Sequence, residues 1–360
     1  MQTVGRGKHI AALLNFRARH VTPKVVRTLR NALPDATVLV SEDLDQARRH
    51  ARRIAEERPE VVLGGGGDGS IVKLINLVRE ASGGWLPTLG VFRLGTGNAW
   101  ARVTGANEFE EDVKLLARMP WPLPTQRFDM IDVDGTWCHF AGVGWDARLI
   151  NDYLRNLDKR SEQLVGSRVA TALHKGLGGY LYSLFRYTVP EEAGAALRFG
   201  QPRVLVEAID GDVFTLDSQG RPFPLRDAEG KTPRVLYEGP MGVAAAGTEP
   251  EWGYGFRAFP MAQAVPGYVN VRVYDRPPIE ATRKMFKLWR GEFPEPGMHD
   301  FYSKHFRMRF SRPMPFQIAG DGLGQRDTIE MKVAPRTADL VDWTAARASL
   351  TTGDASRPAP

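Results

Sequence analysis

In the first third of the chain, short apolar runs alternate with longer segments whose apolar residues recur at helical spacing. The apolar runs predict four strands, at Ile10–Asn15, Ala36–Val40, Val61–Leu63 and Leu89–Phe92. The helical spacing predicts helices at Pro23–Leu33, Leu44–Glu57 and Ser70–Glu80. This alternation indicates an α/β N-terminal domain with a parallel sheet wrapped by helices, over residues 1–127.

After about Phe128 the pattern changes to short β-rich runs that are separated by Gly and Pro. Runs of this kind predict a mainly antiparallel β-sandwich or barrel over residues 128–337. The helices expected within this part are Trp145–Tyr153, roughly Arg168–Arg186, and Glu280–Trp289. A length of 360 residues agrees with two domains, because single hydrophobic cores seldom grow so large.

The charge of the chain is +6 and its isoelectric point is near 9.4, which favours acidic partners such as nucleotide phosphates or an anionic membrane surface. The single cysteine, Cys138, fits a reducing compartment. The N-terminal apolar run Ile10–Leu14 is too short for a signal peptide, and no stretch approaches the ~20 apolar residues of a membrane-spanning helix. A cytoplasmic protein, soluble or peripheral to a membrane, is therefore expected.

The most informative segment is a glycine-rich loop, Gly64–Ser70, that follows the third strand and precedes a helix. Glycines permit positive φ and close approach to a ligand, and their N–H groups can bind phosphate oxygens together with the helix N-terminus. Asp68 within such a loop would repel phosphate unless it holds Mg²⁺ or accepts a proton. The alternative is a tight turn in which Asp68 is the N-cap of the helix.

A second loop, Leu94–Asn98, follows the next strand. Its Thr96 and Asn98 are polar groups beside small residues, which suits the ribose or base of a nucleotide. Sheets of parallel strands bind ligands at the carboxyl ends of the strands, where both loops fall. Together the two loops predict a nucleotide site at this edge.

These motifs resemble a known family. Gly66–Ser70 is similar to the GGDG(T/S) signature of diacylglycerol, sphingosine and ceramide kinases, and Leu94–Asn98 resembles their second loop, LGTGN. The similarity continues in order along the chain, through Gly142–Ala147, Phe259–Ala262, Pro266–Val271 and Gln317–Leu323.

The resemblance implies a lipid kinase that uses ATP and Mg²⁺, with a C-terminal segment at about 338–350 that returns to the nucleotide domain. It implies nucleotide binding by the following residues: Asn15, Ser41, Gly65, Gly66, Gly67, Asp68, Gly69, Ser70, Gly95, Thr96, Gly97 and Asn98. It implies catalytic roles for Asp68, Asp146 and Asp321, with Asp68 and Asp321 as the metal ligands.

Several positions depart from the family pattern. Val72 and Lys73 stand where Asn and Glu are usual, Ala99 replaces the Asp after LGTGN, and Arg93 replaces a proline. The DGE triplet reads Ala319-Gly320-Asp321, so its first carboxylate is missing. Asp321 could substitute if the backbone slips by two residues, and Asp146 could orient either carboxylate. Lys73 and Arg93 either meet phosphate charge or are ordinary solvated cations.

Three further segments bear on partners. Leu164–Phe185 carries leucines at helical spacing, which indicates core packing or a groove for a lipid chain. Arg283–Arg290 separates cationic from apolar residues, which suits either an interfacial helix on anionic lipid or a helix packed on the β-rich domain. Arg48–Arg53 lacks interleaved aromatic residues, so nucleic acid is not expected as a partner. A homodimer is left open.

Three hypotheses follow. The first is an ATP-dependent lipid kinase, and the second is a nucleotide-binding protein of the same fold without kinase activity, motivated by Lys73, Ala99 and Ala319. The third is an NADP-binding oxidoreductase, because Gly64–Gly69 satisfies G-x-G-x-x-G after a strand and Arg93 could meet a 2′-phosphate. Against the third, that fingerprint usually follows the first strand.

Overall fold

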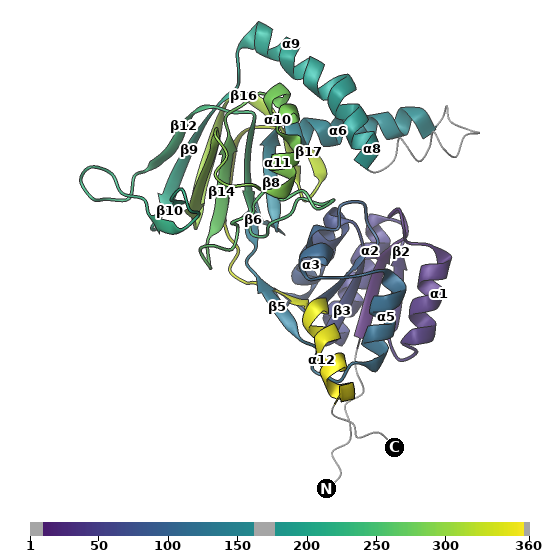
Figure 1. Ribbon diagram of the computed structural model, residues 1–360. Helices are drawn as coiled ribbons and strands as arrows, with labels where there is room; N and C mark the ends of the chain where they lie inside the picture. The colour runs from purple at the N-terminus through teal and green to yellow at the C-terminus, as the bar shows by residue number, and fades with distance from the viewer. Residues whose placement is uncertain (1–9, 162–176, 356–360) are drawn as a thin grey trace. The chain divides into compact units, whose positions relative to one another are not determined.

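The computed structural model describes residues 10–161 and 177–355, which form two compact units (Figure 1). The α/β unit contains the described residues up to Phe128 and those from Arg336 onward, and the β unit runs from Asp129 to Pro335. The chain therefore leaves the α/β unit once and returns to it near its C-terminal end.

The α/β unit is built on a six-stranded sheet in the order β2-β1-β3-β4-β18-β5. Its strands are β1 (Ile10–Asn15), β2 (Thr37–Ser41), β3 (Val61–Gly66), β4 (Thr88–Arg93), β5 (Thr125–Phe128) and β18 (Ala338–Val341). The first four are parallel to one another, whereas β18 pairs in parallel with β4 and antiparallel with β5. The returning segment thus completes the sheet.

Six helices of the described residues belong to this unit, and a side-chain cap marks where α2 begins. They are α1 (Pro23–Ala32), α2 (Leu44–Glu57), α3 (Asp68–Ser82), α4 (Ala99–Val103), α5 (Phe109–Arg118) and α12 (Trp343–Ala355). Asp43 accepts a hydrogen bond from the Gln46 amide at 2.7 Å and so caps α2. The indole of Trp343, at the start of α12, is fully buried and lies 5.6 Å from the Phe92 ring of β4.

The β unit contains a twelve-stranded antiparallel sheet. Its strands are β6 (Ile131–Val133), β7 (Thr136–Cys138), β8 (Phe140–Gly144), β9 (Arg203–Asp210), β10 (Phe214–Leu216), β11 (Pro222–Pro224), β12 (Val235–Pro240), β13 (Val243–Gly247), β14 (Val269–Tyr274), β15 (Met298–Ser303), β16 (His305–Ile318) and β17 (Asp321–Val333). The predicted combination of a parallel α/β unit with a large antiparallel β unit is confirmed.

Strand β16 joins the two halves of this sheet. Its first part, His305–Phe310, pairs with β9, and its last part, Phe316–Ile318, pairs with β8. The register with β17 is irregular between Arg309 and Met314. An irregularity of this kind bends the strand and increases its local twist, which lets one strand pair with β9 along its first part and β8 along its last.

The helices of the β unit differ from the predicted ones. They are α6 (Trp145–Ser161), α8 (Leu177–Ser183), the π-helical turn η1 (Leu184–Thr188), α9 (Val189–Phe199), α10 (Pro278–Arg283) and α11 (Met285–Arg290). The predicted helix end at Arg186 is wrong, because helical structure continues without a break from η1 into α9. Pro190 does not interrupt it, since it lies in the first turn of α9, where proline is tolerated. The expected helix Glu280–Trp289 is two helices separated at Lys284. Part of the predicted Arg168–Arg186 helix lies outside the described residues.

Candidate functional site

The four parallel strands of the α/β unit end at one edge of the sheet. Asn15 at the end of β1 pairs with Ser41 at the end of β2, and Gly66 at the end of β3 pairs with Arg93 at the end of β4. The two glycine loops follow β3 and β4 directly. The structure therefore brings the residues of the predicted nucleotide site together at the carboxyl edge.

Close packing explains the first three glycines of the loop. Gly64, Gly65 and Gly66 are buried residues of β3. A Cβ atom would lie 2.5 Å from Ile71 Cδ1 if placed on Gly64, and 2.3 Å from Leu14 Cδ2 if placed on Gly65. The expectation that this loop uses positive φ is wrong, since no glycine from 64 to 69 has one. The missing side chains of these glycines leave space for the side chains of neighbouring residues. The part of the loop that lies at the carboxyl edge of the sheet begins at Gly67.

Gly67 is the N-cap of α3, with extended φ and ψ of −86° and 176°. Its carbonyl oxygen accepts hydrogen bonds from the amides of Ser70 and Ile71, at 2.8 and 3.1 Å. A Cβ on Gly67 would have no heavy atom closer than Gly95 Cα at 3.8 Å. Asp68 is the first helical residue, so the alternative that made it the N-cap is wrong. Helix geometry leaves the Gly69 amide in the first turn without an acceptor within α3.

The second loop is interlocked with the first. A Cβ on Gly95 would lie 2.2 Å from Gly67 Cα and 2.7 Å from the Gly66 carbonyl oxygen. Asn98 adopts left-handed φ and ψ of 59° and 45°, and its side chain accepts from the Gly95 amide at 2.7 Å and donates to the Gly95 carbonyl at 3.0 Å. The side-chain amide of Asn98 thus closes the turn from Gly95 to Asn98. Thr96, within this turn, is half-buried.

Asp68 connects the two loops. Its Oδ1 accepts a hydrogen bond from the Ala99 amide at 2.7 Å, at the start of α4. Burial raises the pKa of Asp68 to about 6, against the opposing effect of the amides of Ala99 and Asn98. A carboxyl group with a pKa near 6 is ionised at neutral pH and is a stronger proton acceptor than an ordinary aspartate. The residue therefore combines a structural hydrogen bond with a raised proton affinity.

Two other predicted residues lie at the same edge in supporting positions. Asn15 Nδ2 donates to Ser70 Oγ at 2.9 Å, and Asn15 Oδ1 accepts from the Arg17 amide at 3.0 Å. The Ser41 side chain is buried, and its hydroxyl points to the Leu14 carbonyl oxygen at 3.5 Å. Asn15 thereby holds the first turn of α3, whereas Ser41 faces the backbone of β1.

The predicted carboxylate Asp146 lies in the β unit, in the first turn of α6. It is 6% exposed, and its Oδ2 lies 3.4 Å from Gln317 Nε2. Within the described residues Asp146 Oδ1 has no hydrogen-bond partner. Burial raises the pKa of Asp146 to about 6. The Gln317 side chain also accepts from the Gly320 amide at 3.0 Å, which connects Asp146 to the β16–β17 hairpin.

Asp321 begins β17 directly after a two-residue turn. Ala319 and Gly320 both have positive φ, 48° and 83°, as a type I′ hairpin turn requires. The register pairs Ile318 with Asp321 and Gln317 with Gly322. The turn therefore fixes Asp321 at the first position of the returning strand, and its substitution for the missing carboxylate stays a prediction.

The three carboxylates do not belong to one unit. Asp68 is in the α/β unit, and Asp146 and Asp321 are in the β unit, so their cooperation stays a prediction. Among the residues that the structure describes, no group of three or more His, Cys, Asp or Glu side chains could hold a metal ion. Mg²⁺ is commonly held by one or two carboxylates together with substrate phosphates, so Asp68 alone suits a site of that type.

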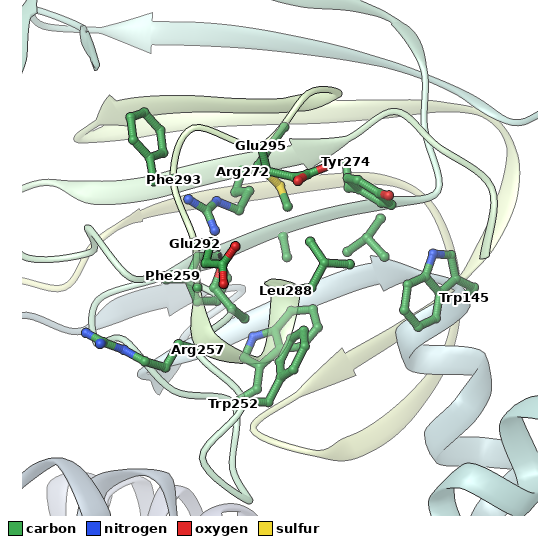
Figure 2. A pocket seen from close by; sticks show the side chains of 16 residues that line it. Trp145, Trp252, Arg257, Phe259, Arg272, Tyr274, Leu288, Glu292, Phe293 and Glu295 are labelled. Carbon is green, nitrogen blue, oxygen red and sulfur yellow. Dashed lines mark hydrogen bonds between the residues drawn. The ribbon is translucent and has the colours of Figure 1, made fainter. Parts of the chain in front are cut away.

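An apolar cavity lies within the β unit (Figure 2). Its lining includes the rings of Trp145, Trp252 and Phe259 and the side chain of Leu288. One wall carries Arg272, which is neutralised by two hydrogen bonds to Asp300 at 2.7 and 2.8 Å. The cavity therefore offers an aromatic and aliphatic interior without a free cation from Arg272.

Sequence reasoning placed a lipid groove elsewhere. Of the segment Leu164–Phe185, residues 164–176 lie outside the described part, and the described remainder does not line this cavity. Trp252 and Phe256 were missed, because they lie in a loop and show no periodicity, and Phe259 was noted only as part of a motif and not as a cavity residue. The sequence feature that could have indicated this cavity was the amphipathic segment Arg283–Arg290, in which Leu288 points toward the cavity.

Comparison with known proteins agrees with this geometry. The family model of the diacylglycerol kinase catalytic domain matches residues 15–121. These residues contain both glycine loops and Asp68. The match agrees with the resemblance found in the sequence over these residues.

Solved structures share the fold over nearly the whole chain. Three solved structures of Bacillus anthracis proteins, each 15% identical, align with TM-scores of 0.59, 0.58 and 0.55. They cover 94%, 93% and 93% of this chain and 98%, 97% and 96% of their own. Two of these proteins are described provisionally as diacylglycerol kinases, and the third is described as a diacylglycerol kinase. No curated protein matches the sequence.

The lengths and compositions of the helices bear on whether the described chain crosses a membrane. No helix among residues 10–161 and 177–355 combines the length and the apolar character needed to cross a bilayer.

Proposed function

We propose that this protein is an ATP- and Mg²⁺-dependent lipid kinase that phosphorylates the hydroxyl group of a diacylglycerol-like or sphingoid-like acceptor. The observation that carries the proposal is the interlocked pair of glycine loops at the carboxyl edge of the sheet, with Asp68 between them at a pKa of about 6. Both loops lie within the residues that match the kinase family.

The residues present suit a triphosphate. The contact of Gly95 with Gly67 leaves no room for a side chain on Gly95, which keeps the second loop close to the start of α3. The N-terminus of a fifteen-residue helix favours phosphate through its dipole and its first-turn amides. ATP would supply the transferred phosphoryl group, and Mg²⁺ would offset the charge of its oxygens.

The chemistry assigned to the chain is a proton transfer. In the proposed reaction the acceptor hydroxyl oxygen forms a bond to the γ-phosphorus while the bond from that phosphorus to the bridging oxygen breaks, which yields a phosphorylated lipid and ADP. Asp68 accepts the hydroxyl proton, because its carboxyl group is ionised above pH 6 and can then bind a proton. The apolar lining of the β-unit cavity suits the hydrocarbon part of a lipid.

A labelled-phosphate assay tests this proposal. We expect the purified chain to transfer label from ATP to at least one of diacylglycerol, sphingosine and ceramide presented in mixed micelles. Asp68→Asn should lower the rate at least about 100-fold, as loss of a general base does. An Asn at position 68 keeps an oxygen that can accept from the Ala99 amide, so folding, and ATP affinity measured without Mg²⁺, should change little.

The matched control is Asp43→Asn, since Asp43 caps α2 and Asn caps helices equally well. It should leave the rate unchanged. No labelled lipid, under conditions in which a related kinase works, contradicts the proposal.

One observation favours the second hypothesis, a nucleotide-binding protein without transfer activity. Asp68 Oδ1 is already bonded to Ala99, the residue that replaces a family aspartate. ATP binding by calorimetry together with an absence of turnover would establish this alternative. The oxidoreductase hypothesis finds no comparable support, because Gly64 and Gly66 lie inside β3 and not in the turn.

A further inference from the structure

The outer side of α10 and α11 carries exposed apolar and cationic side chains together. Phe286 is 80% exposed and Ile279 is 47% exposed, and Arg283, Lys287 and Arg290 are also exposed. At ~100° per residue, Phe286, Lys287 and Arg290 fall within one arc of about 100° on α11, and Ile279 and Arg283 lie about 40° apart on α10. A large aromatic ring that is almost fully exposed among cations is unusual for a surface that contacts only water.

The inner side of the same helices is anchored to the β unit. Ala281 is buried, Leu288 lines the apolar cavity, and the Trp289 ring lies edge-on to Phe256 with centroids 5.7 Å apart. Lys284 forms an ion pair with the buried Glu295. Because these contacts fix which side faces inward, Phe286 cannot turn into the core. Packing on the β unit accounts for the apolar residues of the inner side but not for Phe286.

The charge on this surface is incompletely neutralised. Within the described residues Arg283 and Lys287 form no ion pair, whereas Arg290 pairs with Glu292. Free cations beside exposed apolar side chains are complementary to lipid headgroups above an apolar layer. Two copies of one chain meeting through this surface would place its cations against each other.

The end of α9 adds a second exposed segment beside the first. Gln201, just after α9, donates to the Asp275 carbonyl oxygen at 2.7 Å, just before α10. Leu197 is 91% exposed and Phe199 is 62% exposed, with the Arg198 guanidinium 5.0 Å from the Phe199 ring centroid. The combination of exposed apolar and cationic side chains therefore recurs on the neighbouring helix.

We propose that α10 and α11, with the end of α9, form a docking surface for anionic membranes. Phe286, Ile279 and Leu197 enter the interfacial layer of the bilayer, and Arg283 and Lys287 contact anionic headgroups. This surface lies over the apolar cavity that Leu288 lines. The inference does not require catalysis, so it can fail while the kinase proposal stands, and the reverse also holds.

Vesicle sedimentation with the full-length protein tests the docking surface. We expect binding to phosphatidylcholine vesicles that also contain phosphatidylserine, little binding to pure phosphatidylcholine vesicles, and weaker binding at high salt. Arg283→Gln with Lys287→Gln should lower the partition coefficient about 25-fold, since each cation near an anionic surface contributes roughly fivefold. Phe286→Ser should lower it about tenfold or more through lost apolar burial.

Matched controls lie elsewhere on the chain. Arg49→Gln with Arg52→Gln removes two exposed cations of α2, and Phe223→Ser removes an exposed ring of β11. Both should bind vesicles as the unchanged protein does. The proposal is overturned if anionic vesicles are not bound, or if the controls lose as much binding as the test variants. It is also overturned if light scattering shows a dimer that Phe286→Ser dissociates while vesicle binding is absent.

Discussion

At the scale of single residues, burial changes the proton affinity of the aspartates that the sequence singled out. Asp68 and Asp146 both have a pKa raised to about 6 by loss of solvent, although each keeps some polar contacts. The two differ in those contacts: the backbone amides of the second loop and the start of α4, Ala99 foremost, stabilise the charge of Asp68, whereas Asp146 has the Ala147 amide and the long Gln317 contact. Asp146 therefore has less compensation for its charge.

The ionisation of Asp146 should be visible in the pH dependence of stability. Its pKa is about 6 in the folded protein and about 3.8 ordinarily, so between these values the folded state retains a proton that the unfolded state releases. Stability falls as pH rises through this window, and above pH 6 the cost is complete, on the order of 3 kcal/mol.

Asp146→Asn removes this cost. We expect it to raise the free energy of unfolding at pH 8 by about 2 kcal/mol and to flatten the decline between pH 4 and 6. Urea unfolding of both proteins across this range measures the effect, with Asp43→Asn as the exposed control. An unchanged pH profile would show that the Asp146 carboxyl is solvated in solution.

At the scale of elements, the two glycine loops stabilise each other through backbone contact. Gly95 faces Gly67 Cα and the Gly66 carbonyl oxygen, which cannot rotate away as a side chain could. Gly67 itself has open space around its Cβ direction and an ordinary φ. The two positions therefore make different demands for glycine.

Alanine at these two positions should separate folding from binding. Gly95→Ala should destabilise the protein by about 3 kcal/mol, because overpacking against backbone is relieved only by moving a loop. Gly67→Ala should change stability by less than about 1 kcal/mol, yet weaken ATP binding if the loop accepts phosphates. Thermal unfolding and calorimetry with ATP measure both. A Gly95→Ala protein of normal stability would contradict the interlocking of the loops.

At the scale of the whole molecule, the α/β unit is assembled from two distant parts of the chain. β18 lies between β4 and β5 in the sheet, and Arg347 of α12 donates to Asp112 of α5 at 3.1 Å. The entire β unit is thus inserted between two segments of a single sheet. A ligand bound at the carboxyl edge should stabilise the α/β unit first.

Hydrogen exchange with and without ATP and Mg²⁺ should reveal this localisation. Binding at 100 times the dissociation constant adds about 2.7 kcal/mol to the ligand-bound state. We expect slower exchange at the start of α3 and in residues 94–99. Strands β9 and β12 of the β unit serve as the internal reference and should not change. Protection confined to the β unit would contradict an ATP site at the glycine loops.

The sequence by itself determined the features that depend on neighbours along the chain. Alternating apolar runs and helical spacing predicted the four parallel strands from Ile10 to Arg93, and the spacing of glycines and polar residues indicated the two loops. The resemblance to the diacylglycerol kinase catalytic domain was readable in Gly66–Ser70 and Leu94–Asn98, since a continuous motif keeps its order without knowledge of the fold.

The tertiary structure decided which contacts these residues make. Asp68 and Ala99 are thirty-one positions apart, and Gly95 meets Gly67 only because β3 and β4 pair in register. The cavity lined by Trp252 and Leu288 likewise joins a loop to a later helix. Such contacts depend on packing between distant segments, which local periodicity does not encode, and the same packing determines which aspartates are buried and which aromatic ring, Phe286, remains exposed.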